Sequence, residues 1–127
     1  METQEGYERL SVWQNAMTLV DGVYDVSEHW PSSETFGLVL QARRAAVSVP
    51  ANTAEGHGRS GPREYLHHLS IANGSLCEVQ TLLRIAHRRR FVSDDELTRL
   101  LHATTEVSRP LKGLIRKLRE TAKASPH

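Results

Sequence analysis

The sequence of 127 residues contains a single cysteine, Cys77, and no long apolar run. One cysteine excludes an intramolecular disulfide and a zinc site built from thiolates, and we expect Cys77 to be a small, partly buried apolar side chain. No segment approaches the ~20 apolar residues that a membrane-spanning helix needs. The acidic start of the chain, residues 1–5, lacks the basic and apolar regions of a secretory signal. These absences predict a cytoplasmic protein that spans no membrane.

Glycine and proline are also few, and they break the chain at residues 31–33 and 56–62; with a third boundary near Ser93, the chain has four long segments. Ser93 and Glu96 open the last segment with the spacing of a helix capping box. No segment alternates apolar and polar residues with a period of two, so no sheet is expected. Apolar steps of three and four are typical of antiparallel helical bundles. The sequence predicts an all-α, antiparallel up-down four-helix bundle over residues 7–123, with disordered tails at 1–6 and 124–127.

One apolar stripe in each segment is expected to face the core. The stripes of the third and fourth segments are Tyr65, Leu69, Ala72, Leu76, Val79, Leu83 and Ala86, and then Leu97, Leu100, Thr104, Val107, Leu111, Leu114 and Leu118. The stripe of the first segment is Leu10, Trp13, Met17, Val20 and Tyr24. The stripe of the second segment is Phe36, Leu40, Arg43, Val47, Pro50 and Ala54.

The second segment places a proline and an arginine on its expected core side. Pro50 removes one backbone hydrogen bond and clashes with the preceding turn, so we predict that helix two is kinked there. A buried Arg43 would need a carboxylate partner, and the candidates are Glu55, Glu64 and Glu78. The alternative is that Arg43 binds an anion in a cavity of the bundle.

The first segment carries more apolar surface than one bundle seam needs. A second stripe lies about a third of a turn around the helix from the first, and a stripe of this kind left in water would form a large exposed patch. We predict that it contacts another subunit, the alternative being a wide face buried inside one bundle. The predicted oligomer-interface residues are Val12, Leu19, Val23 and Val26.

The sequence shows no complete catalytic constellation. Residues 56–61 match the glycine spacing of a dinucleotide-binding turn, but that motif works only between a strand and a helix, so these residues are interpreted as a helix end and a loop. Glu64 and His67 match one half of a di-iron site, and the chain has no second pair of this spacing. We therefore expect no enzymatic activity, no cofactor and no metal site.

The charge is unevenly distributed. Residues 1–83 carry five arginines against ten carboxylates, whereas residues 84–127 carry eleven lysines or arginines against five. Clustered cations are typical of phosphate-backbone binding, and the scarcity of aromatic residues argues against a protein that stacks on single-stranded bases. The alternative is an ordinary solvated face. The predicted nucleic-acid-binding residues are Arg88, Arg89, Arg90, Arg109, Lys112, Arg116, Lys117, Arg119 and Lys123.

Several stretches resemble one known family. They are residues 10–14 (LSVWQ), 23–24 (VY), 36–38 (FGL), 41–52 (QARRAAVSVPAN), 54–56 (AEG), Tyr65, residues 71–76 (IANGSL) and Glu78. Together, over about residues 7–120, they resemble the four-helix-bundle family of proteins encoded in intervening sequences of bacterial 23S rRNA genes, also called the S23 ribosomal protein family. The chain departs from the family pattern at Thr53, where an aliphatic residue is usual, and at residues 88–91, where Arg-Arg-Arg-Phe replaces a glycine-containing turn.

This resemblance implies a ring-shaped homopentamer without enzymatic activity. A similar protein, the accessory variability determinant of diversity-generating retroelements, binds nucleic acid and a reverse transcriptase through a basic surface. The resemblance also implies that Arg43, Arg44, Asn52, Glu55 and Glu78 form a structural polar network. We therefore expect a non-enzymatic homo-oligomer that binds nucleic acid, foremost RNA. The alternative is a protein-interaction scaffold without a nucleic-acid role.

Overall fold

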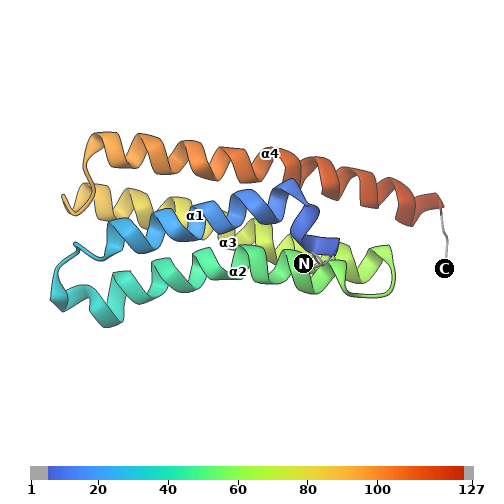
Figure 1. The fold of residues 1–127 in the computed structure, drawn as a ribbon, viewed down its shortest axis with the longest axis horizontal. Coiled ribbons are helices and arrows are strands. Elements are labelled where there is room, and N and C mark those ends of the chain that lie inside the picture. Colours follow the sequence, from blue (N-terminus) through green and yellow to red (C-terminus); the bar gives the residue numbers. More distant parts are fainter. Residues whose placement is uncertain (1–5, 125–127) are drawn as a thin grey trace, which may run out of the picture.

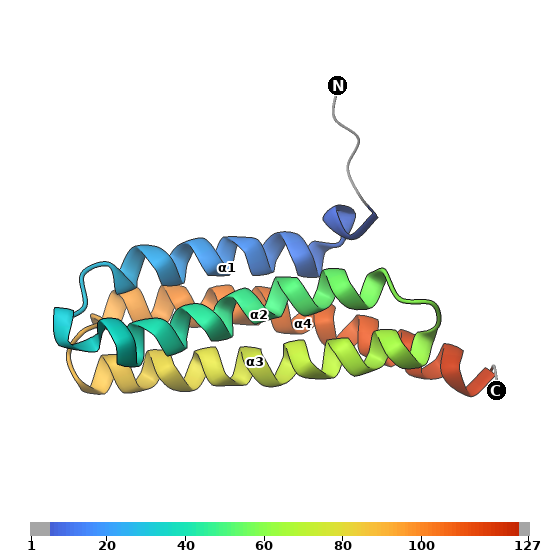
Figure 2. The same ribbon diagram turned by 90° about the horizontal axis from the view of Figure 1, so that it is seen from below.

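The computed structural model describes residues 6–124, which form four helices lying side by side (Figure 1). They are α1 (Ser11–Ser27), α2 (Leu40–His57), α3 (Pro62–Arg88) and α4 (Asp94–Ala124). Each helix runs opposite to the one before it, and each packs against its neighbours in the chain, while α4 also packs against α1 (Figures 1 and 2). The predicted up-down bundle is confirmed.

The predicted tails fall mostly outside this range. Residues 1–5 and 125–127 lie outside the described residues. Gly6, placed at the end of the N-terminal tail by the sequence, begins a 3₁₀ turn, Gly6–Arg9, that leads into α1.

Helix ends follow the expected punctuation. The Ser93 hydroxyl accepts a hydrogen bond from the Glu96 amide at 3.1 Å, and the Glu96 carboxylate accepts one from the Ser93 amide at 2.9 Å. This reciprocal pair is the predicted capping box. The glycine-rich stretch is a loop between α2 and α3, as interpreted from the sequence, and Gly61 adopts a φ of 123° that favours glycine. Pro62 then begins α3, where its missing N–H costs nothing.

The turn between α3 and α4 contains no glycine. The Phe91 amide donates to the Ala86 carbonyl at 2.9 Å, and the Arg90 amide donates to the His87 carbonyl at 3.0 Å. These two bonds form a Schellman motif, which needs a left-handed residue just after the helix end. Arg90 occupies that position with a φ of 68°. An arginine therefore occupies the left-handed position of this turn, which favours glycine.

The core stripes predicted for the last two helices are confirmed. Leu69, Leu76 and Leu83 of α3 and Val107 and Leu111 of α4 are at most 1% exposed. Tyr65, Leu97, Leu114 and Leu118 complete these stripes as partly buried residues packed against the core. Among residues 6–124 no helix has an apolar stretch that is long enough to cross a membrane.

The stripes assigned to α1 and α2 were wrong in most positions, although Pro50 is buried and Val20 packs against the core. The interior of α1 is formed by the residues predicted to contact another subunit: Val12, Leu19, Val23 and Val26 are 2%, 0%, 0% and 5% exposed. The interior of α2 consists mainly of small residues, and its buried positions are Ala42, Ala45, Ala46, Val49, Pro50, Thr53 and Gly56. Small side chains let helices approach closely; a Cβ on Gly56 would lie 2.8 Å from His68 Cβ.

Several large apolar residues of α1, of α2 and of the segment Thr35–Val39 before α2 lie at the surface instead. Met17 and Tyr24 are 39% and 41% exposed, and Phe36 and Val47 are 88% and 41% exposed. On a helix with two apolar stripes, periodicity alone does not tell which stripe faces the core. In α2 the small residues permit close packing, whereas in α1 three valines and Leu19 form the interior.

Two helices contain an internal proline. α2 continues through the buried Pro50, and the kink predicted at this residue stays a prediction. Non-helical backbone angles occur instead at Gly37, in the segment Thr35–Val39 before α2. α4 likewise continues through Pro110, which has no N–H to donate to the carbonyl of Glu106. That carbonyl accepts a hydrogen bond from the Asn15 side-chain amide at 3.0 Å.

Candidate nucleic-acid interface

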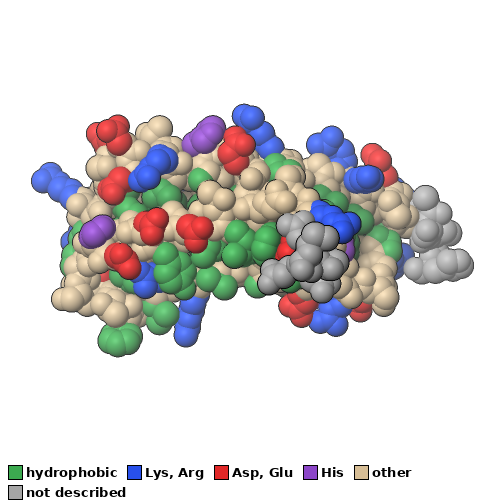
Figure 3. All heavy atoms as spheres, viewed as in Figure 1, with side chains coloured by type: hydrophobic (Ala, Val, Ile, Leu, Met, Phe, Trp, Pro, Cys, Tyr) green, Lys and Arg blue, Asp and Glu red, His purple; other side chains and the backbone are tan. Residues whose placement is uncertain are grey.

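A line of cations follows the C-terminal half of α4. Arg109, Lys112, Arg116, Arg119 and Lys123 are all exposed and recur at steps of three and four residues. At 1.5 Å per residue the line is about 21 Å long. None of the five forms an ion pair within the part of the chain that the structure describes. We call these five residues the α4 cation row; Lys and Arg side chains are visible above the C-terminal half of α4 in Figure 3.

The other predicted basic residues lie apart from this row. Lys117 is exposed, but one residue corresponds to about 100° around a helix, which places it on the opposite flank of α4 from Arg116. Arg88, Arg89 and Arg90 are exposed at the other end of the bundle, beside the first residue of α4. Arg109 lies about 22 Å along α4 from that end. The predicted residues therefore form two separate groups, with Lys117 apart from both, and do not make one surface.

Two further basic residues join the row from α3. Because α3 and α4 are antiparallel, the first turns of α3 lie beside the last turns of α4 (Figure 2). A groove of about 360 Å³ between these two helices contains Arg63 and His67 on one side and Arg119 on the other. The remaining residues of its lining are Leu66, Ser70, Asn73 and Ile115. The sequence analysis missed Arg63 and His67, although the predicted topology already placed them near the end of α4.

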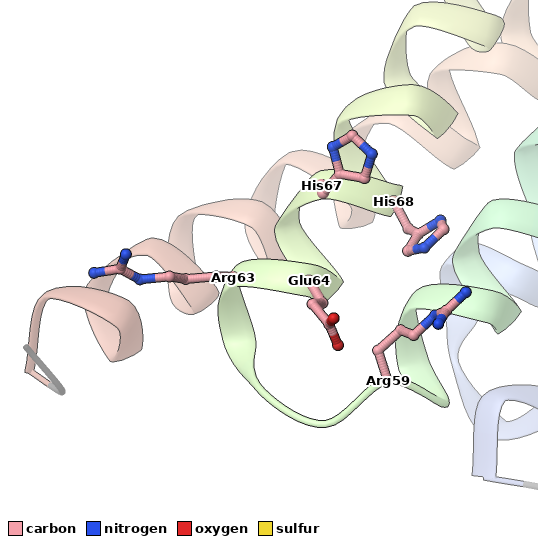
Figure 4. A pocket seen from close by; sticks show the side chains of 5 residues that line it. All are labelled: Arg59, Arg63, Glu64, His67 and His68. Atoms are coloured by element: carbon pink, nitrogen blue, oxygen red, sulfur yellow. The ribbon is translucent and has the colours of Figure 1, made fainter. Parts of the chain in front are cut away.

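A second hollow adjoins the groove and shares Arg63 and His67 with it (Figure 4). Its lining also includes Glu64 and Arg59. Arg59 is neutralised, since its guanidinium lies 2.8 Å from the Glu55 carboxylate. Figure 4 shows Arg63 extending away from Glu64. This hollow thus carries mixed charge, whereas no carboxylate lines the groove between α3 and α4.

A polar network joins α2 to α3, and of the five residues that the resemblance implied it contains Asn52, with Glu55 at its edge. The Asn52 amide donates to the Ser48 carbonyl and hydroxyl, each at 3.0 Å, and the Ser75 hydroxyl donates to that of Ser48 at 2.8 Å. His68 Nδ1 lies 3.1 Å from Asn52 Oδ1, which as an acceptor assigns the proton of a neutral His68 to Nδ1. Glu55 lies at the edge, 3.9 Å from the same nitrogen. These bonds hold two helices in register, and the network is structural.

Arg43 belongs to a different cluster and has no carboxylate partner there. Its guanidinium stacks on the ring of Tyr24 at 4.5 Å, Nε donates to the Ser27 hydroxyl at 2.9 Å, and Nη2 donates to the Tyr24 carbonyl at 3.3 Å. The expected pairing with Glu55, Glu64 or Glu78 was wrong, because Arg43 is only half-buried and keeps contact with water. Arg44 and Glu78 are exposed and make no side-chain hydrogen bond among residues 6–124, so they belong to neither cluster.

Two polar groups are buried without a partner in the described residues, the Trp30 Nε1 atom and the Tyr65 hydroxyl. Burial raises the pKa of Tyr65 above its ordinary value of 10.0. Trp30 packs near Phe91, at the end of the bundle that contains the α3–α4 turn. Cys77, by contrast, is exposed on the surface of α3, so the expectation of partial burial was wrong.

An apolar surface covers the seam between α1 and α2. The contact between Tyr24 and Arg43 places the outer stripes of the two helices side by side. Apolar side chains are visible along this seam in Figure 3. We call it the α1/α2 apolar face, and its residues, exposed or half-buried, are Trp13, Met17, Val20, Tyr24, Leu40 and Val47.

Comparison with known protein families gives a match over most of the chain. The sequence model of the family described as 23S rRNA-intervening sequence protein matches residues 8–113. No curated protein matches the chain. The matched range includes all of α1, α2 and α3 and the first two-thirds of α4, so it ends inside the α4 cation row.

Proposed function

The chain belongs to the family of 23S rRNA-intervening sequence proteins, and we propose that it is a non-enzymatic homo-oligomer that binds nucleic acid, foremost RNA, through the α4 cation row. The observation that carries this proposal is the row itself. Five exposed cations on one helix face have no ion pair among the described residues.

The shape of the row favours a linear polyanion over a small anion. Its cations are about 4.5–6 Å apart along the axis, and a nucleic-acid strand carries one charge per about 3.4 Å of helix axis. A length of about 21 Å therefore spans several consecutive phosphates of one strand. Such contacts hold the backbone without selecting a base sequence.

The cations of the row have no ion pair among the described residues, whereas two arginines of α2 and the following loop already have protein partners. Arg59 is paired with Glu55, and Arg43 is stacked on Tyr24 and bound to a hydroxyl. A cation that already has a protein partner gains less from a phosphate than one that is surrounded only by water. Binding through free cations releases counterions and therefore weakens steeply with salt.

The α1/α2 apolar face supports the oligomeric part of the proposal. We propose that a second copy of the chain covers it, since the family resemblance implies a ring-shaped homopentamer. A ring uses two different surfaces on each copy, so the α1/α2 apolar face of one subunit would contact a different part of the next. This replaces the interface residues predicted from the sequence, which are buried in the bundle.

The first test is a titration of purified, nuclease-treated protein against a structured RNA and a duplex DNA. We expect binding to both at about 50 mM salt and a loss of affinity of about two to three orders of magnitude by about 200 mM. No binding to either nucleic acid at low salt would overturn the proposal and favour a protein-interaction scaffold.

A further inference from the structure

We propose that the groove between α3 and α4 seats one nucleotide unit of a bound RNA strand, with Arg63 and Arg119 on its phosphate and Ser70 and Asn73 on its ribose. This inference rests on the proposed function, since it assigns a subsite beside the α4 cation row. It adds residues of a second helix to the interface and gives a reason for a preference between RNA and DNA.

The charge of the groove selects an anion. Arg63 and Arg119 belong to different helices and line the groove from opposite sides. Neither forms an ion pair among residues 6–124, and no carboxylate is part of the lining. Two guanidinium groups facing the same space provide up to ten N–H donors and no acceptor. A phosphate oxygen is the ligand that suits this arrangement, because arginine binds phosphate in a bidentate manner.

The neutral polar groups of the groove suit a sugar. Ser70 and Asn73 follow Arg63 by seven and ten residues, so they line the same side of α3 two and three turns further along. Neither side chain makes a hydrogen bond in the part of the chain that the structure describes. A hydroxyl and an amide can both donate and accept, and so can the 2′-hydroxyl of ribose. Deoxyribose lacks that group, so these two residues would contact RNA more strongly than DNA.

The size and floor of the groove fit one nucleotide unit. Its volume of about 360 Å³ lies at the small end of the range of ligand sites. Leu66 and Ile115 form an apolar part of the lining against which the carbon atoms of a sugar can pack. Because Arg119 belongs to both the groove and the α4 cation row, a strand in the groove would continue along α4.

The test compares three variants in binding to an RNA and a DNA of the same sequence and strandedness. The first is Arg63→Gln, the second is the double variant Ser70→Ala with Asn73→Ala, and the control is Arg99→Gln, which removes an exposed charge from the other half of α4. We expect Arg63→Gln to weaken both RNA and DNA binding about 3–10-fold and to lower the salt slope by about 1. The Ser70/Asn73 variant should weaken RNA binding several-fold and leave DNA binding unchanged.

Failure of this inference can be told apart from failure of the proposed function. If Arg63→Gln binds like Arg99→Gln while the wild type binds RNA tightly, the groove is not a phosphate subsite although the proposed function stands. If the Ser70/Asn73 variant weakens RNA and DNA equally, or neither, the ribose assignment is wrong. If the wild type binds no nucleic acid at low salt, the proposed function itself fails.

Discussion

The side-chain amide of Asn15 in α1 supplies the hydrogen bond that Pro110 denies to α4. Proline has no N–H to offer the carbonyl four residues earlier, which is that of Glu106. Asn15 Nδ2 donates to this carbonyl at 3.0 Å. The carbonyl that lacks a partner within α4 thus forms a specific contact with α1, one turn before the first residue of the α4 cation row. The pair fixes the position of α1 against the middle of α4.

The first prediction concerns this pair. Asn15→Ala should lower the free energy of unfolding by about 0.5–1.5 kcal/mol, because the Glu106 carbonyl loses its partner. Pro110→Ala restores an N–H in α4, so in that background Asn15→Ala should cost less. A double-mutant cycle in urea measures the difference as a coupling energy. Equal costs of Asn15→Ala in the two backgrounds would show that the amide does not compensate for the proline.

The second prediction concerns the α3–α4 turn. Arg90 adopts a φ of 68°, a conformation that is strained for residues with a Cβ. Arg90→Gly should therefore raise the free energy of unfolding by about 0.5–1 kcal/mol. Arg89→Gly is the matched control, because it removes the same charge at a position whose φ of −83° is helical. Denaturant unfolding measures the free energy of unfolding of both variants. If Arg90→Gly loses as much stability as Arg89→Gly, the backbone at Arg90 is not strained.

The third prediction concerns Tyr65. Its hydroxyl is buried without a partner in the described residues, so Tyr65→Phe should leave the stability at pH 7 unchanged or raise it by up to about 1 kcal/mol. Burial raises the pKa of Tyr65 in the folded state. Above pH 10.0, the ordinary pKa of tyrosine, the unfolded chain loses this proton first, and the free energy of unfolding falls as pH rises.

The pH dependence separates this tyrosine from the other groups that titrate in the same range. Urea unfolding of the wild type and of Tyr65→Phe at about pH 8 and about pH 11 measures the difference. We expect the wild type to lose more stability than the variant between the two. Parallel losses in both proteins would mean that Tyr65 ionises equally in the folded and unfolded states.

The fourth prediction concerns the α1/α2 apolar face. Met17→Glu and Val47→Glu should each dissociate the oligomer without loss of helicity, because both side chains are about 40% exposed in the single bundle. Thr18→Glu is the matched control, since Thr18 is exposed on the polar side of α1. Val23→Glu would instead bury a charge in the core and unfold the chain. Light scattering gives the mass and circular dichroism the helicity; an unchanged mass in both face variants would contradict the assigned surface.

Much of the fold could be predicted from the sequence, because local rules determine it. The Ser93–Glu96 capping box, the glycine loop before Pro62 and the regular steps of α3 and α4 each indicated the structure that is observed. These signals act within one or two helical turns. Tertiary packing did not have to be known for any of them.

The arrangement of α1 and α2 could not be predicted in the same way. α1 has two apolar stripes, and α2 has a face of small residues beside its larger apolar ones. Which face is buried depends on how closely a neighbouring helix approaches. Gly56 and Ala46 sit where α2 must come close to other helices, so the small residues turn inward. Size complementarity between helices is a tertiary property that hydrophobic periodicity does not contain.

The candidate site was predicted in part for a related reason. The α4 cation row could be identified because its spacing lies within one helix. Arg63 and His67 are far from it in sequence, and only the antiparallel packing of α3 on α4 brings them to Arg119. Arg43 contacts the Tyr24 ring and the Ser27 hydroxyl instead of the expected carboxylate. Because Arg43 is partly exposed, the free-energy cost of leaving its charge without an ion pair is lower.

The most direct measurement is the salt dependence of RNA affinity for the wild type and for a variant with the whole α4 cation row, Arg109, Lys112, Arg116, Arg119 and Lys123, changed to glutamine. We expect the variant to keep its helicity, to bind at least about 100-fold more weakly at about 50 mM salt, and to show a slope smaller by about 3–4. The control is Arg88, Arg89 and Lys117 changed to glutamine, which removes exposed cations outside the row and should change both quantities much less. Unchanged affinity and slope in the row variant would contradict the assignment of nucleic-acid binding to α4.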